Sequence, residues 1–123
     1  MPRFVVLFHE CPGGSPRPSH WDLMLETDGA LRTWALARAP DEATEQLAER
    51  LPDHRIAYLD YEGPVAGDRG HVMRWDAGDY RELIAEPQHL VIELRGMRLR
   101  GEVTLDCDAA DAQRLRFTFS PSR

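Results

Sequence analysis

The chain has 123 residues, of which 42% are hydrophobic and 29% charged, and its formal net charge is −6. This length supports one ordinary hydrophobic core, so we expect a single domain over residues 1–123. No apolar run approaches the roughly 20 residues of a membrane helix, and we expect neither a signal peptide nor a membrane partner. Two cysteines are too few for a disulfide framework and favour a reduced, cytoplasmic location. The acidic balance argues against a broad nucleic-acid-binding surface.

The first third of the chain predicts three strands and one loop. Residues 3–9 are rich in β-branched and aromatic side chains, and residues 20–27 alternate between apolar and polar. The Asp28-Gly29 pair is a hairpin signal and predicts a return strand over 31–37. The Pro- and Gly-rich residues 11–19 predict a loop, which lets the first two strands lie side by side.

Residues 41–51 carry a helical pattern. Asp41 can cap the helix and the acidic residues after it suit the positive end of the helix dipole. Ala43, Leu47 and Leu51 would then share one face. We therefore predict one main helix at about 41–51.

The rest of the chain returns to strand patterns, separated by turn signals. We predict a turn at 76–78, a short helical turn over 79–86, and strands over 54–61, 71–75, 90–94, 97–105 and 115–119. The predicted fold is mainly β, a compact antiparallel β-barrel of about 7–8 strands with one main helix.

Two residues of the second strand point the same way. The period of two places His20 and Asp22 on one face, with Cβ atoms about 6–7 Å apart. His9 ends the preceding strand, and the three side chains together could hold a divalent ion at about 2.0–2.2 Å. Such a set suits Mn²⁺, Fe²⁺ or Zn²⁺ better than Mg²⁺. The alternative is that all three are ordinary polar residues at strand ends.

Other residues with chemical potential lie outside this set. His54 and Tyr58 would share one side of a strand, where they could contact a phosphate or donate a proton, or serve only structure. Glu26 and Glu62 are carboxylates that could orient a ligating histidine. Cys11 is close to His9 in sequence, but nothing marks it as an activated nucleophile.

Six short motifs occur in order along residues 4 to about 105. They are Phe4-Val5-Val6 with His9; His20-Trp21-Asp22 with Glu26; Asp28-Gly29 with Leu31 and Trp34-Ala35; Asp53-His54 with Tyr58 and Tyr61-Glu62-Gly63; Val72 with Trp75-Asp76 and Gly78; and Leu94-Arg95-Gly96 with Arg98-Leu99 and Gly101. This order resembles the 3′-phosphoesterase domain of bacterial DNA ligase D, the ligase of nonhomologous end joining.

The resemblance implies a small β-barrel that trims 3′ ends of DNA or RNA with Mn²⁺, or with another divalent ion such as Zn²⁺. It removes a terminal ribonucleoside and then the 3′-phosphate left behind. His9, His20 and Asp22 would be the metal ligands. The other site residues implied are a catalytic histidine, an active-site tyrosine and, more loosely, a basic residue, namely His54, Tyr58 and Arg38.

The resemblance also implies partners. The substrate would be the 3′ end of a primer–template. We expect a stand-alone protein that acts by itself or beside a separate end-joining ligase or polymerase.

One position departs from the family pattern. The family usually carries an arginine two residues after the aspartate, where this chain has Met24. A charge-assisted contact is worth about 1.5–3 kcal/mol, so its loss would slow catalysis by roughly 10- to 100-fold. This departure favours an alternative, a catalytically weak or inactive relative that binds a nucleic-acid end, a nucleotide or a protein partner. The acidic surface leaves open a third reading, a phosphoesterase for a small phosphorylated metabolite.

Overall fold

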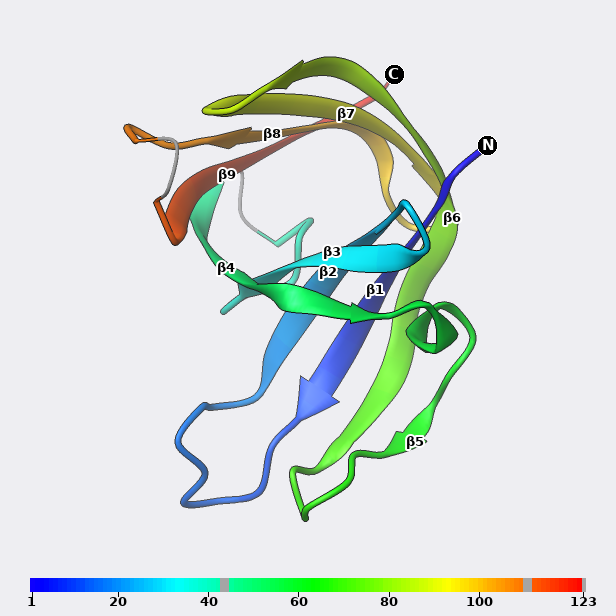
Figure 1. Cartoon of the computed structure of the whole chain (residues 1–123), viewed down its shortest axis with the longest axis vertical. Helices are drawn as coiled ribbons and strands as arrows, with labels where there is room; N and C mark the ends of the chain where they lie inside the picture. Colours follow the sequence, from blue (N-terminus) through cyan, green and yellow to red (C-terminus); the bar gives the residue numbers. More distant parts are fainter. Residues whose placement is uncertain (43–44, 110–111, 123) are drawn as a thin grey trace.

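The computed structural model describes residues 1–42, 45–109 and 112–122, and its strands form one antiparallel sheet (Figure 1). The strands are β1 (Arg3–Glu10), β2 (His20–Thr27), β3 (Ala30–Leu36), β4 (Glu45–Arg55), β5 (Gly63–Pro64), β6 (His71–Glu86), β7 (His89–Gly96), β8 (Arg100–Asp106) and β9 (Arg114–Pro121). A single 3₁₀ turn, η1 (Ile56–Leu59), follows β4. Within the described ranges, no helix is both long enough and apolar enough to cross a membrane.

The sheet closes on itself. Its strand order is β1-β2-β3-β4-β9-β8-β7-β6-β5, and β1 also pairs with β6. Eight strands therefore form a ring, and the short β5 pairs with β6 beside it. The mainly β, antiparallel class predicted from the sequence is confirmed.

The predicted helix over 41–51 is wrong, because residues 45–51 belong to β4. This strand pairs with β3 on one side and with β9 on the other, and Ala48 is buried in the ring while Leu47 is 67% exposed. An isolated helix of about 11 residues is marginal, and pairing with two neighbouring strands outweighs local propensity. Asp41 and Glu42 lie in a turn, and Ala43 falls outside the described residues.

Two further boundaries also differ from the predictions. The predicted strand over 54–61 stops at Arg55 and continues as η1. The predicted turn at 76–78 and helical turn over 79–86 both lie inside the 16-residue strand β6. Gly78 misled the prediction because it serves close packing: a Cβ there would lie 2.0 Å from the Arg95 carbonyl oxygen of β7.

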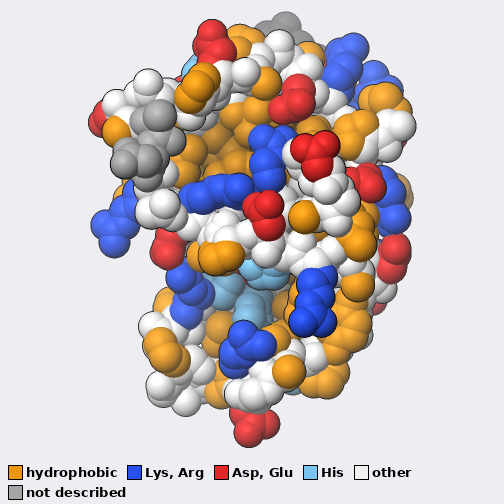
Figure 2. All heavy atoms as spheres, in the orientation of Figure 1, with side chains coloured by type: hydrophobic (Ala, Val, Ile, Leu, Met, Phe, Trp, Pro, Cys, Tyr) orange, Lys and Arg blue, Asp and Glu red, His pale blue; other side chains and the backbone are white. Residues whose placement is uncertain are grey.

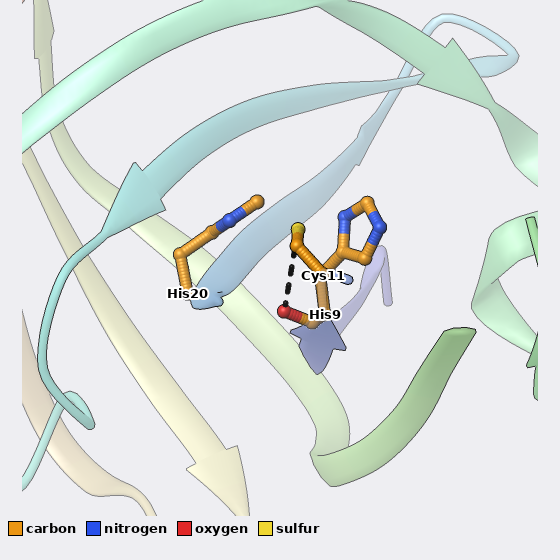
Figure 3. A group of neighbouring side chains, drawn as sticks. All are labelled: His9, Cys11 and His20. Atoms are coloured by element: carbon orange, nitrogen blue, oxygen red, sulfur yellow. Dashed lines mark hydrogen bonds between the residues drawn. The ribbon is translucent and has the colours of Figure 1, made fainter. Parts of the chain in front are cut away.

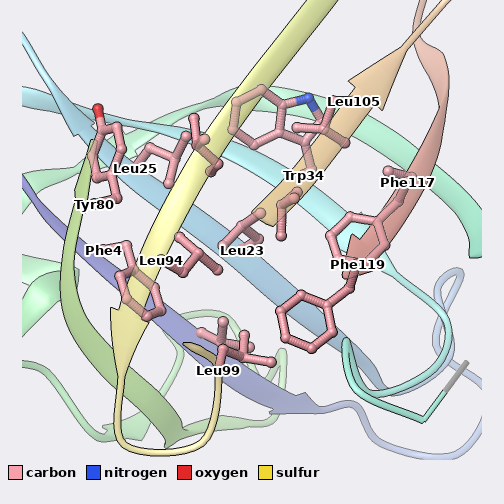
Figure 4. Close-up of a cluster of buried hydrophobic side chains, with 14 of the residues drawn as sticks. Phe4, Leu23, Leu25, Trp34, Tyr80, Leu94, Leu99, Leu105, Phe117 and Phe119 are labelled. Carbon is pink, nitrogen blue, oxygen red and sulfur yellow. The ribbon is translucent and has the colours of Figure 1, made fainter. Parts of the chain in front are cut away.

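Strands β1 and β2 bury apolar side chains on both faces. Phe4, Val6 and Leu23 point into the ring and pack with Phe117, Phe119 and other buried residues (Figure 4). The intervening residues belong to a second buried cluster, made of Val5, Leu7, Met24, Leu31, Leu59 and Val72. We call it the outer cluster. Two-sided burial fixes the register of these strands, because a slip of one residue would exchange the two faces.

The turn between β7 and β8 is organised by a buried carboxylate. Asp76, only 3% exposed, accepts backbone N–H bonds from Met97, Arg98 and Leu99 at 2.8–3.1 Å. Gly96 makes room for it, since a Cβ there would lie 2.2 Å from Asp76 Oδ2. Two of the motifs on which the resemblance rests therefore meet here in a structural role.

Candidate metal centre

Pairing of β1 with β2 brings the three predicted ligands together. His9 and His20 are directly opposite one another, and Asp22 is opposite Leu7. All three side chains lie on the face of the outer cluster, next to its apolar residues. The two imidazole rings are 4.9 Å apart between centroids.

The hydrogen bond of His9 determines which of its ring nitrogens can bind a ligand. His9 Nε2 lies 2.7 Å from the backbone carbonyl oxygen of Arg69, so this nitrogen donates its hydrogen. The lone pair is then on Nδ1, which lies 3.9 Å from Asp22 Oδ2. A carbonyl partner of this kind is what holds a metal-ligating imidazole in one tautomer.

His20 is held in the same manner through its other nitrogen. Its Nδ1 donates to the carbonyl oxygen of Pro18 at 2.9 Å, so that Nε2 faces Asp22 Oδ1 at 3.1 Å. Burial opposes a charge on this ring, but the adjacent Asp22 carboxylate outweighs it and raises the pKa of His20. Both histidines thus direct a nitrogen toward the same carboxylate.

The Asp22 carboxylate has the environment of a group that needs a cation. Asp22 is 2% exposed, and its buried Oδ1 has no hydrogen-bond partner among the described residues. Two atoms bound to one ion at about 2.1 Å and a right angle are about 3.0 Å apart, close to the 3.1 Å between His20 Nε2 and Asp22 Oδ1. The donor set of two imidazoles and one carboxylate fits a divalent transition metal.

Sequence reasoning did not assign Cys11 to this cluster. The ligand atoms of His9, Cys11 and His20 all lie within 4.8 Å of one another (Figure 3). Burial, followed by the charge of Asp22, raises the pKa of the Cys11 thiol. The His9-x-Cys11 spacing was the available signal, but a loop of unknown course gave no reason to turn the thiol back toward His20.

The other predicted site residues divide into two groups. His54 and Tyr58 are in contact, edge to face at 5.8 Å between ring centroids, although Tyr58 is in η1 rather than in a strand. His54 Nδ1 donates to the Pro52 carbonyl, which leaves Nε2 free. Arg38 is exposed in the connection after β3, where its guanidinium donates to the Glu45 carbonyl, and no contact of the described residues joins it to the histidines.

The carboxylates expected to orient the histidines do not do so. Glu26 accepts a hydrogen bond from the Arg3 backbone N–H, and Glu62 from that of Arg74. Backbone carbonyls take over this function, and the sequence gives no signal for them.

A hollow flanked by arginines adjoins the histidines. Figure 2 shows histidine side chains gathered in a recess between basic side chains, all of which are arginine because the chain has no lysine. A cavity of about 400 Å³ on this part of the molecule is lined by Arg55, Ala57, Tyr58, Tyr61, Pro64, Ala66 and Arg69. Arg69 connects the two, since its carbonyl holds His9 while its side chain borders the cavity.

The structure is therefore that of a small protein with a closed antiparallel sheet. Its candidate metal centre consists of two imidazoles and a buried carboxylate. The model of the DNA ligase D 3′-phosphoesterase domain matches residues 14–106. The chain therefore belongs to this family. The matched span contains His20, Asp22, His54 and Tyr58, whereas His9 and Cys11 precede it.

Full-length relatives point the same way. The chain is 38% identical over 93 residues to the multifunctional non-homologous end joining protein LigD of Pseudomonas aeruginosa. The aligned segment covers 67% of this chain. It is 33% identical over 111 residues to LigD of Mycobacterium bovis and 29% identical over 119 residues to LigD of Mycolicibacterium smegmatis. The aligned segments span only 11%, 14% and 15% of those three proteins, respectively.

Proposed function

We propose that this protein is a metal-dependent phosphoesterase that trims 3′ ends of DNA or RNA during nonhomologous end joining. It would remove a terminal ribonucleoside and then the 3′-phosphate. The observation that carries this proposal is the convergence of His9, His20 and Asp22. A ring nitrogen of each histidine is directed at the buried Asp22 carboxylate, whose Oδ1 has no hydrogen-bond partner among the described residues.

His9, His20 and Asp22 would hold the ion, Mn²⁺ in the first instance. A divalent ion bound there would neutralise phosphate charge and would lower the pKa of an attacking water. The Pro18 and Arg69 carbonyls keep both rings oriented. Both imidazoles thus already present a ring nitrogen toward Asp22.

The cavity beside this cluster suits a nucleic-acid end. Arg55 and Arg69 present guanidinium groups for backbone phosphates, and Tyr58 and Tyr61 present rings on which a base can stack. A small local site of this kind is compatible with a chain of net charge −6, because only the terminal nucleotides need to be held. The partner would be a primer–template end in the cytoplasm, handed on to an end-joining ligase or polymerase.

His54 is placed to assist at the reacting phosphate. Its free Nε2 would hold a phosphoryl oxygen or donate a proton to the leaving oxygen, with the Tyr58 ring packed against it. We expect His54→Ala to lower kcat by about 10²- to 10⁴-fold. The matched control is His89→Ala, because His89 pairs with Asp106 elsewhere in the sheet and should leave kcat unchanged.

The proposal is tested with a primer–template that ends in one ribonucleotide or in a 3′-phosphate. Wild-type protein with Mn²⁺ should release the ribonucleoside and inorganic phosphate, and Asp22→Asn should abolish both reactions together with Mn²⁺ binding measured by calorimetry. Asp28→Asn, in the exposed turn of the same hairpin, serves as the control and should behave as wild type. Activity that survives in Asp22→Asn would exclude the proposed centre.

Met24 supports a second candidate, a relative that binds 3′ ends but turns them over weakly. The side chain is 1% exposed within the outer cluster, so it offers a phosphate neither charge nor access. This candidate is favoured if the wild-type protein binds Mn²⁺ and a 3′-phosphorylated primer–template but releases no product.

A further inference from the structure

The thiol of Cys11 lies between the two histidines of the candidate metal centre. In Figure 3 the sulfur sits between the His20 and His9 rings. The sulfur and one ring nitrogen of each histidine all lie within 4.8 Å of one another. Two ligands of one tetrahedral ion are about 3.3–3.6 Å apart for bonds of 2.0–2.3 Å. Separations of up to 4.8 Å would therefore have to shorten by at most about 1.5 Å for the sulfur to share an ion with both rings.

Contacts of Cys11 do not give its side chain another function. The backbone N–H of Cys11 donates to the Ser19 hydroxyl at 2.9 Å, which closes the base of the 11–19 loop without the side chain. Among the described residues, the only hydrogen bond of the thiol is a long one, 3.9 Å to the His9 carbonyl oxygen. A structural role in the loop would therefore be served equally well by serine.

A separate observation indicates that a cation belongs here. Asp22 is 98% buried, and its Oδ1, which faces His20 Nε2, has no hydrogen-bond partner in the described part of the chain. An anionic oxygen in such a place is costly unless a positive charge, on the adjacent imidazole or on a bound metal ion, balances it. The thiol lies beside the two rings that flank this carboxylate.

We propose that Cys11 is a further protein ligand of the metal centre and gives it a preference for thiophilic ions such as Zn²⁺ and Co²⁺ over Mn²⁺. This inference rests on the proposed metal-dependent function and specifies the ligand set. On binding, the thiol releases its proton to solvent as the metal–sulfur bond forms. Thiolate ligands select softer metals, whereas carboxylate and water suit Mn²⁺. Cys11 precedes the segment matched by the family model, which begins at residue 14.

Co²⁺ is the probe that reports the sulfur directly. Metal-free protein is titrated with Co²⁺ and followed by absorption spectroscopy, where a thiolate-to-cobalt charge-transfer band in the near ultraviolet is separate from the visible d–d bands. We expect both bands in wild type, and loss of only the charge-transfer band in Cys11→Ser. The second free cysteine gives a matched control: Cys107→Ser should retain both bands. Thermal unfolding of each variant, monitored by circular dichroism, establishes that it is folded.

Competition titrations provide the second measurement. Loss of a residue that only hydrogen-bonds to a metal ligand typically weakens metal binding by roughly 10- to 100-fold. Cys11→Ser removes a ligand itself and should weaken Zn²⁺ binding by at least that factor, while Mn²⁺ affinity should change much less. Visible d–d bands without a charge-transfer band in wild type would overturn the role of Cys11 while leaving the proposed centre intact. Failure of wild type to bind Co²⁺, Zn²⁺ or Mn²⁺ would overturn both.

Discussion

At the scale of single residues, Met24 shows how one side chain can belong to the core and to the site at once. It lies two residues after Asp22 on the same face of β2, yet it is buried beside Val5, Leu7 and Leu31. The position where the resemblance implies a phosphate-holding arginine is thus a packing position here.

Met24→Arg is consequently expected to destabilise the protein. It would bury a guanidinium without a counterion, at a cost of several kcal/mol. Met24→Leu should cost less than about 1.5 kcal/mol, because it keeps the apolar volume. Urea unfolding of both variants measures the difference. Unchanged stability of Met24→Arg would mean that the long side chain reaches solvent and would make it a usable test of catalysis.

The sequence predicted the members of the candidate centre better than their partners. The period of two placed His20 and Asp22 together, and the loop allowed His9 to join them across β1 and β2. The backbone carbonyls that fix the two tautomers come from Pro18 and from Arg69, which is 60 residues from His9. No side-chain pattern encodes a main-chain acceptor at such a distance.

At the scale of elements, the β7–β8 turn depends on the fit between Gly96 and Asp76. A Cβ at residue 96 would lie 2.2 Å from Asp76 Oδ2 and 2.7 Å from Phe4 Cζ. Gly96→Ala should therefore destabilise the protein by about 1–3 kcal/mol or more. Gly13→Ala, with nothing within 4 Å of its Cβ, is the control and should be neutral in the same thermal or urea unfolding experiment. Equal stability of the two variants would contradict this account of the turn.

The 11–19 loop is tied to β4 by an ion pair. Arg17 donates to both carboxylate oxygens of Glu49 at 3.1 and 2.9 Å, and this hydrogen bonding lowers the pKa of Glu49 below its ordinary value of 4.5. A depressed carboxyl pKa stabilises the fold above the unfolded-state value, and the stabilisation is lost as the pH falls through the folded-state pKa.

Glu49→Gln should accordingly reduce the free energy of unfolding at neutral pH and have no effect in strong acid. Both side chains are about 40% exposed, so we expect a difference of at most about 1 kcal/mol. Urea unfolding from pH 7 down to about pH 2 measures it, with Glu102→Gln as an exposed control on β8. A difference that stays constant over this range would contradict the assigned ion pair.

The predicted strands followed from β-branched and aromatic residues, from turn signals and, for residues 20–27, from alternation; the failures have physical causes. Strand β2 was predicted with its observed bounds because its two faces differ so regularly in polarity. Strand β4 was not, since Ala, Glu, Gln and Leu favour a helix locally and only pairing with β3 and β9 makes the segment extended. The strand β6 was broken up by a glycine that serves contact with β7.

At the scale of the whole molecule, the ring is closed at two junctions that join distant parts of the chain. One is β1 with β6, and the other is β4 with β9. Local sequence predicted a compact antiparallel sheet but could not specify these partners, because pairing over long sequence separations depends on the complete set of buried faces.

The β4–β9 junction is expected to be essential for stability. Phe117 of β9 is fully buried and is paired with Gln46 of β4, so Phe117→Ala should cost about 3–5 kcal/mol. A small domain has only about 5–15 kcal/mol in total, so the variant should be largely unfolded at moderately raised temperature. Leu47→Ala, on β4 but 67% exposed, should melt close to wild type. Similar melting temperatures for the two variants would contradict this view of the closure.

The separation of the two apolar clusters has a consequence for divergence among relatives. Alternate residues of β1 and β2 have different functions. One set fills the interior of the ring, and the other forms the outer cluster beside the histidines. Substitutions around the histidines can alter reactivity while the interior cluster is left unchanged. A lineage can in this way lose or exchange its chemistry and still pass on the same architecture.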